Sequence, residues 1–247
     1  MNSGTAASPM HREPALLGQT VVVIGGSAGM GLETARHARA EGANVILIGR
    51  DPGRLEQAAR ELDAQSTAAF DVTNFQSVAK FFDELSAPDD HVMVTGPGPY
   101  YAPLADFDFD AACRDLEAHV LLPLHIARNA ARKVRPGGTL LFIGGTGGRS
   151  TAVGLTLIST LTAAMPAMTK NLALELAPVR VNLIAAGLVD TPLSAAILGD
   201  ELDKRREHLR TTLPIRRVVA LAVHLMVNTA VTGATFDIDG GQQLVEG

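Results

Sequence analysis

The sequence predicts an α/β fold in which a doubly wound parallel sheet carries helices on both faces. Two patterns lead to this prediction. Short apolar runs alternate with longer segments of helical spacing along most of the 247 residues, as in proteins built from repeated strand–helix units. The first run, residues 21–24, is apolar at every position, which is typical of a strand buried on both faces of a parallel sheet.

Seven segments have the length and the flanking residues of strands. The second is centred on Val-Ile-Leu-Ile, and the fourth and fifth end in the glycine-rich stretches 96–99 and 144–148. Such stretches cannot continue a ladder of strand hydrogen bonds. We expect strands at residues 21–24, 44–49, 68–71, 91–95, 139–143, 179–184 and 235–238.

Helical segments separate these strands. Pro52 suits the first turn of a helix that starts at Asp51, and the triplet Pro136-Gly137-Gly138 should break the longest helical region. We expect helices at residues 32–40, 51–62, 74–85, 108–135, 156–177, 193–210 and 220–228. Because strands and helices alternate throughout, the seven strands should form one parallel sheet in a single domain.

The composition of the chain argues against several classes of partner. The chain is 47% hydrophobic and 19% charged, with a net charge of −5, which argues against nucleic acid as a partner. No apolar run reaches the ~18 residues that a membrane-spanning helix needs, so we expect no membrane partner. The single cysteine, Cys113, excludes an internal disulfide and favours the reducing cytoplasm as the location. No His/Cys cluster has metal-ligand spacing, so we expect no metal site.

The chain divides into a short leader and one domain. Residues 1–18 lack the basic and apolar regions of a secretory signal, and we expect them to form a flexible leader. Residues 19–247 contain no linker or internal repeat and should form the single domain. Within it, the charged segment at about 193–213 is expected to form a helical lid.

A glycine-dense turn, Gly25-x3-Gly29-x-Gly31, joins the first strand to the first helix. Glycines let the backbone approach an anion closely, and the helix N-terminus offers unpaired N–H groups, so the turn predicts a phosphate site. Two alternatives stay open on these residues alone. The turn could hold no ligand, or it could be the G-x-S-x-G elbow of an α/β-hydrolase with Ser27 as nucleophile, although that elbow normally follows several strands.

Five further segments are informative when they are taken with this turn. They are Asp71-Val-Thr, Lys170-Asn-Leu-Ala-Leu-Glu-Leu-Ala177, Arg180-Val-Asn182, Gly187-Leu-Val-Asp-Thr-Pro192 and Ile238-Asp-Gly-Gly241. Together the segments resemble the motifs of the short-chain dehydrogenase/reductase family over nearly the whole chain. Two places differ: Ile24 stands where the family usually has threonine, and the connection from Arg217 to Ala220 is shorter.

The resemblance implies a Rossmann-type fold and several ligands and partners. The expected partners are a nicotinamide dinucleotide, an unknown small-molecule substrate and further copies of the chain, in a homodimer or homotetramer. Pairing would use the fourth and fifth helices and the last strand. An excess of apolar residues supports this: Leu121, Leu122, Leu124 and Ile126 exceed what one core-facing stripe needs.

The end of the second strand favours NADP(H) over NAD(H), which stays open as the alternative. NAD-binding relatives carry Asp or Glu there, whereas this chain has Gly49 followed by Arg50. A guanidinium at that place can hold a 2′-phosphate with two hydrogen bonds. The cofactor-binding positions that the resemblance implies are Gly25, Ser27, Gly29, Met30, Gly31, Arg50, Asp71, Val72, Gly96, Gly187, Val189 and Thr191.

The family's catalytic groups have no counterparts in this chain. Members use a tyrosine, a lysine four residues later, a serine and an asparagine, because the chemistry needs a phenol beside a cation. Neither of the two tyrosines, Tyr100 and Tyr101, is followed by that lysine. The resemblance aligns other residues with the vacated positions: Gly145 for serine, Ile158 for tyrosine, Thr162 for lysine and His119 for asparagine.

Three functions remain open for an NADP(H)-binding member of this kind. Hydride transfer could be weak, non-standard or absent in an oxidoreductase homologue. The protein could instead be a non-catalytic nucleotide-binding regulator or subunit. A third option is a reductase with a relocated acid, either His119, which can donate a proton at neutral pH, or Tyr100.

Overall fold

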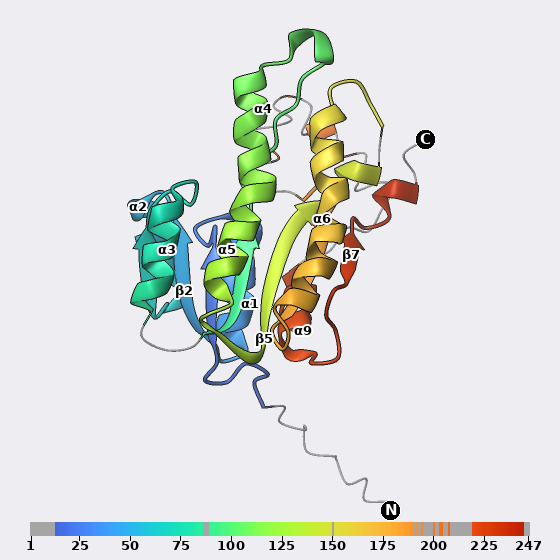
Figure 1. Ribbon diagram of the computed structural model, residues 1–247. Helices are drawn as coiled ribbons and strands as arrows, with labels where there is room; N and C mark the ends of the chain where they lie inside the picture. Colours follow the sequence, from blue (N-terminus) through green and yellow to red (C-terminus); the bar gives the residue numbers. More distant parts are fainter. Residues whose placement is uncertain are drawn as a thin grey trace, which may run out of the picture.

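The computed structural model describes residues 13–85, 89–149, 151–189, 191, 194, 200, 203, 204, 207 and 219–244 (Figure 1). Across them, seven parallel strands form one sheet in the order β3-β2-β1-β4-β5-β6-β7. The strands are β1 Thr20–Ile24, β2 Asn44–Gly49, β3 Ser66–Ala69, β4 Asp89–Thr95, β5 Val134–Gly145, β6 Arg180–Ala186 and β7 Thr235–Ile238. The predicted seven-stranded, doubly wound Rossmann-type sheet is confirmed.

Helices cover both faces of this sheet (Figure 1). The α-helices are α1 Gly29–Ala40, α2 Pro52–Leu62, α3 Phe75–Glu84, α4 Phe109–Leu116, α5 Leu122–Ala130, α6 Thr156–Glu175 and α9 Val219–Val227. Four short turns complete the described elements: the 3-10 helices η1 Leu104–Asp106, η3 Gly147–Arg149 and η4 Gln242–Leu244, and the π-helix η2 Glu117–Leu121. No helix in the described part of the chain is long and apolar enough to span a bilayer.

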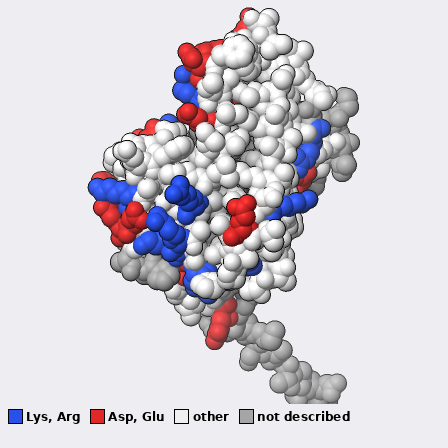
Figure 2. Space-filling view, in the orientation of Figure 1, with Lys and Arg blue, Asp and Glu red and all other residues white. Residues whose placement is uncertain are grey.

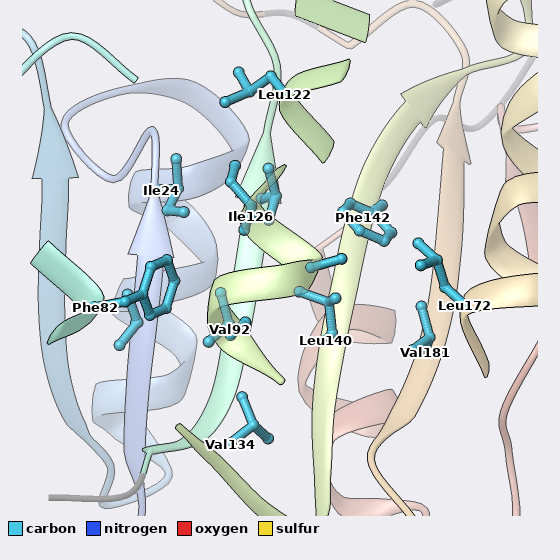
Figure 3. Packing of buried hydrophobic residues seen from close by; sticks show 14 of the residues in the cluster. Ile24, Phe82, Val92, Leu122, Ile126, Val134, Leu140, Phe142, Leu172 and Val181 are labelled. Carbon is cyan, nitrogen blue, oxygen red and sulfur yellow. The ribbon is translucent and has the colours of Figure 1, made fainter. Parts of the chain in front are cut away.

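Alternation along β1 explains the two-sided core. Val21 and Val23 pack with α1, α2 and α9, whereas Val22 and Ile24 pack with α3, α5 and α6, because successive strand residues point to opposite faces. Figure 3 shows the second of these clusters, where Phe82 of α3 and Ile126 of α5 approach the strands. Both faces are therefore apolar, as the continuous apolar runs in the sequence predicted.

Several predicted boundaries are wrong by a few residues, and two of them have clear causes. The third strand ends at Ala69 rather than residue 71, because Ala69 pairs with Gly49, where β2 also ends. The longest helical region stops at Ala130 rather than residue 135, because Val134 already pairs with Asp89 in the β4–β5 ladder. The ladder shifts its register between Asp89 and His91, which accommodates the Pro-Gly-Gly triplet inside β5 rather than before it.

The predicted leader is also too long. Leu16 is fully buried, and its N–H donates to the carbonyl of Glu41 at 2.9 Å. The packed domain therefore begins before residue 19. The remaining leader residues, 1–12, lie outside the described residues, as do most of the expected helix 193–210, the lid at 193–213 and the connection from Arg217 to Val218.

A π-helical turn interrupts the long helical region between α4 and α5. Pro123 stands in the first turn of α5 and has no N–H to donate to the carbonyl four residues back. The N–H of Leu122 bonds instead to Glu117, five residues back. Such single π turns are often found at functional sites, and this one carries His119.

Candidate nucleotide-binding and active site

The candidate site lies at the carboxyl ends of the strands, around the place where the strand order reverses. β1 pairs with both β2 and β4, so the connections after β1 and β4 leave in opposite directions along the sheet. In open α/β sheets this switch point is where ligands bind. The glycine turn after β1 and Gly96 after β4 both stand there.

Backbone conformation and a close contact with β4 explain why the first turn contains glycines. Gly25 has φ +82° and Gly29 has φ +54°, and a side chain on Gly25 would overlap the Thr95 hydroxyl. That hydroxyl donates to the Ile24 carbonyl at 3.0 Å and so joins β4 to β1. Helix α1 then starts after Ala28, which provides no side-chain cap. Its first N–H groups are therefore available to an anion, which fits a dinucleotide phosphate.

The end of β2 presents a cation without a neighbouring acid on its own strand. Arg50 is exposed, and no carboxylate pairs with it within the described ranges. Its charge helps to lower the pKa of Asp71, although the hydrogen bond from the Thr73 N–H, 3.0 Å long, contributes more. A Cβ on Gly49 would lie 3.1 Å from the Ser27 hydroxyl, so a larger residue there would crowd the glycine turn.

The segment after β6 closes back on the glycine turn. A Cβ on Gly187 would lie 2.7 Å from Oε1 of Gln242. The Gln242 amide accepts from the Leu188 N–H at 2.9 Å and donates to the Leu188 carbonyl at 3.1 Å. The methyl group of Thr191 would lie 3.5 Å from a Cβ on Gly29. This loop therefore lies beside the glycine turn at the same edge of the sheet.

The structure thus gathers the predicted cofactor residues on one edge of the sheet, and their binding role stays a prediction. They follow β1 (Gly25, Ser27, Gly29, Met30, Gly31), β2 (Arg50), β3 (Asp71, Val72), β4 (Gly96) and β6 (Gly187, Val189, Thr191). Met30 and Val189 pack against the same apolar cluster. In the described part of the chain, no cluster of three His, Cys, Asp or Glu side chains could hold a metal ion.

Three of the aligned catalytic positions meet at the start of α6. Ile158 and Thr162 are buried, with 5% and 6% of their surface exposed. A Cβ on Gly145, at the end of β5, would lie 3.8 Å from the Thr162 methyl group. The Thr162 hydroxyl donates to the Ile158 carbonyl at 2.8 Å. None of these side chains can exchange a proton or carry a charge near neutral pH.

The turn η3 fills the space in front of these positions, which the sequence did not predict. A Cβ on Gly148 would lie 2.9 Å from the backbone nitrogen of Ala163 in α6, so the turn lies almost directly on that helix. The Ser159 hydroxyl donates to the Gly147 carbonyl at 2.9 Å. Arg149 closes the turn with two hydrogen bonds to Asp237 of β7, at 2.7 and 3.0 Å.

His119 is the titratable side chain beside this edge. It lines a small pocket with Gly96, Ile143 and Met165. Its Nδ1 lies 3.0 Å from Oδ1 of Asp115. Burial lowers the pKa of His119, but the hydrogen bonds and the charge of Asp115 outweigh it, so the pKa is raised overall. Sequence reasoning missed Asp115, although its spacing of four residues from His119 on a helical segment was a signal.

The two tyrosines occupy the loop between β4 and α4. The Tyr100 hydroxyl accepts from the Asp108 N–H at 2.8 Å, and its ring packs edge-on against Phe107. Tyr101 is 44% exposed. Burial raises the pKa of Tyr101, and the charge of Asp115 raises it further. Of the two relocated acids considered, His119 is therefore the one that lines the pocket.

Comparisons with known proteins agree with this geometry. A family model described as enoyl-(acyl carrier protein) reductase matches residues 25–243. The chain belongs to the short-chain dehydrogenase/reductase family. A family member from Stachybotrys chlorohalonatus is 28% identical over 249 residues, which cover 92% of this chain and 98% of that one. Human dehydrogenase/reductase SDR family member 4 is 25% identical over 86% of this chain and 80% of its own.

Solved structures of the family superpose well. A short-chain type dehydrogenase/reductase from Mycobacterium ulcerans has a TM-score of 0.83 at 26% identity, over 93% of this chain and 91% of that one. A short-chain dehydrogenase from Burkholderia cenocepacia, solved in complex with NADP, has a TM-score of 0.81 at 23% identity, over 92% and 98% of the two chains. The second similarity concerns the fold alone. The hydrolase alternative at Ser27 finds no support in any of these comparisons.

Proposed function

We propose that the protein binds NADP(H) at the carboxyl edge of its sheet and that its hydride-transfer activity is weak, non-standard or absent. The uncapped N-terminus of α1 would hold the phosphates, and the backbone turn at Gly25 and Gly29 leaves room for them. NADP(H), when bound, supplies or accepts the hydride. We also propose a cytoplasmic location, as the single cysteine favours.

Arg50 supports the preference for NADP(H). It follows Gly49 directly, is exposed, and pairs with no carboxylate in the chain as described. Its guanidinium is therefore free to form charge-assisted hydrogen bonds with a 2′-phosphate. The absence of a side chain on Gly49 removes the carboxylate that would repel that phosphate.

The observation that carries the proposal on activity is the uncharged set formed by Gly145 and the buried Ile158 and Thr162. A positioned general acid contributes about 10²–10⁴-fold to a rate, and no side chain of this set can donate a proton. The Thr162 hydroxyl is already bonded to the helix backbone. Reduction of an ordinary ketone should therefore be slow even with the nucleotide in place.

Nucleotide fluorescence titrations test the binding proposal. We expect NADPH to bind more tightly than NADH, and Arg50→Ala to weaken NADPH binding by roughly 10-fold or more, because charge-assisted hydrogen bonds are lost. Arg54→Ala is the matched control, since Arg54 is an exposed cation of α2 beside Asp51. Equal affinities for the two nucleotides, or no effect of Arg50→Ala, would contradict the proposal.

A panel of simple ketones and aldehydes tests the proposal on activity. With saturating NADPH we expect turnover far below roughly 1 s⁻¹, the low end of ordinary enzyme rates. Turnover at or above that rate would show that the protein is an active reductase with relocated groups. Loss of that turnover in His119→Ala or in Tyr100→Phe would then identify the acid.

A further inference from the structure

Asp115 and His119 form a buried pair of titratable groups that the proposed function does not use. Their side chains are 5% and 13% exposed, and Nδ1 of His119 lies 3.0 Å from both Oδ1 and the backbone carbonyl oxygen of Asp115. The second carboxylate oxygen, Oδ2, is buried and has no hydrogen-bond partner in the described structure. A buried carboxylate is costly unless an opposite charge compensates it, so the pair favours the imidazolium form.

Among the described residues, those that line the pocket around the imidazole add no competing charge. The Pro97 carbonyl accepts a hydrogen bond from the imidazole and so contributes to the raised pKa of His119, after the larger contributions of Asp115. Tyr101 is the other titratable group whose pKa Asp115 affects. The other pocket residues from β4, β5, the helices and the π turn carry no titratable group: Val94, Gly96, Ala118, Leu122, Pro123, Phe142, Ile143 and Met165.

The second ring nitrogen faces the nucleotide edge. Nδ1 is held by Asp115, whereas Nε2 lies 3.9 Å from the point that a Cβ on Gly96 would occupy. Gly96 directly follows β4, at the switch point where a dinucleotide crosses the sheet. Nε2 therefore points toward this edge through a position that has no side chain. Thr162 and Ile158, by contrast, offer this part of the site no cation.

We propose that His119 binds the nicotinamide half of NADP(H), with a charged N–H at Nε2 donated to a ribose hydroxyl, and that Asp115 is its positioning residue. The inference rests on the proposed function, because it requires NADP(H) to occupy the edge beside Gly96. It assigns to the π turn a cation at the nicotinamide end of the site, where Ile158 and Thr162 supply none. A charged donor to a buried hydroxyl is stronger than a neutral one.

The Asp115–His119 pair should make the affinity for one nucleotide, but not for another, depend on the charge of His119. NADPH carries the nicotinamide ribose, whereas 2′-AMP carries only the adenosine with the same 2′-phosphate and has no other phosphate. Titration of that phosphate affects both ligands alike, so the ratio of their dissociation constants isolates His119. As pH rises through the raised pKa of His119, the imidazolium loses its proton, and NADPH binding should weaken relative to 2′-AMP binding by about 10-fold.

Three variants test this assignment by calorimetric titration across a range of pH. His119→Asn, which keeps a hydrogen-bonding side chain without the charge, should abolish the pH dependence of the ratio. Asp115→Asn should move its midpoint to lower pH, because the carboxylate that favours the imidazolium is gone. His125→Asn is the matched control, since His125 of α5 bonds to the Phe75 carbonyl at 2.8 Å, on the α3 side of that helix. It should leave the ratio unchanged.

Each outcome decides a separate point. A ratio that does not change with pH in the wild type, or that keeps its pH dependence in His119→Asn, would overturn this inference and leave the proposed function intact. Failure of both nucleotides to bind the wild type would overturn the proposed function together with this inference. Circular dichroism of each variant separates loss of folding from loss of binding.

Discussion

At the scale of the residue, Thr162 shows how one buried side chain removes a chemistry while the scaffold remains. Its hydroxyl is used within α6, where it donates to the Ile158 carbonyl at 2.8 Å, so it satisfies a buried polar group without reaching the nucleotide edge. Ile158 fills the neighbouring position with an apolar side chain. The pair stabilises the start of α6 and leaves the proton chemistry to other residues.

Asp89 gives a prediction of the same scale, at the amino end of β4. It is 2% exposed, and burial, followed by the charge of Asp90, raises its pKa from 3.8 to about 6. The folded protein therefore binds more protons than the unfolded chain between these values, so this carboxyl destabilises the fold as pH rises through them. Asp89→Asn should stabilise the protein by about 1–3 kcal/mol near pH 8 and by little near pH 4.

Urea unfolding at the two pH values measures this effect. Asp83→Asn is the control, because Asp83 is an exposed partner of Arg132 and should change stability little at either pH. The buried His91 changes folding stability with pH in the opposite sense to Asp89. Burial lowers its pKa to about 4, so stability is lost as pH falls from 6.5 toward 4. Equal stabilisation by Asp89→Asn at both pH values would contradict the assigned cause.

At the scale of the element, η3 is the turn that fills the space in front of the aligned catalytic positions. It follows β5 directly, lies on α6, and is tied to β7 by the Arg149–Asp237 pair. An exposed ion pair alone contributes little. The close packing of Gly148 on Ala163 is therefore the contact that should fix the turn on the helix.

A pair of glycine variants tests that packing. An added Cβ on Gly148 would lie 2.9–3.1 Å from the nitrogen, Cα and Cβ of Ala163, which belong to a rigid helix, so Gly148→Ala should destabilise the protein by about 1–3 kcal/mol. On Gly147 the nearest atoms, Oγ1 and Cγ2 of Thr162 and Cγ1 of Ile158, are 3.5–4.0 Å away. Gly147→Ala should thus change stability by less than about 0.5 kcal/mol. Similar unfolding midpoints for both variants would show that η3 is loosely placed.

The elements also show which features a sequence can predict. Apolar periodicity predicted the strands and helices to within a few residues, because each depends on local spacing. It missed the extension of β5 to Val134, which depends on pairing with Asp89. Motifs predicted which residues stand at the carboxyl edge of the sheet. They could not predict that η3 covers α6, because that depends on tertiary contacts. The Asp115–His119 pair has the i,i+4 spacing of helix neighbours, and the sequence carried that signal although the motifs did not.

At the scale of the whole molecule, the face that carries α4, α5 and α6 has a group of exposed apolar side chains. Leu121 and Leu124 are 42% and 40% exposed, and Leu116 is 45% exposed. Leu122 and Ile126, which the sequence suggested as part of the same excess, are core residues instead. Figure 2 shows that much of this face is free of Lys, Arg, Asp and Glu.

This face leads to the prediction that the protein is a homodimer or homotetramer. The helices expected to pair, residues 108–135 and 156–177, are α4 with α5 and α6 in the structure, and the last strand is β7. Exposed apolar patches of this kind mark interfaces, and homo-oligomers use one patch on both copies.

Light scattering at micromolar concentration should give a multiple of the chain mass of 25.9 kDa. The double variant Leu121→Glu, Leu124→Glu should lower that mass, because two charges would be buried without partners. Leu17→Glu, at the opposite end of the sheet and 67% exposed, should not. A monomeric wild type would refute the assembly, and an unchanged mass in the double variant would place the interface elsewhere.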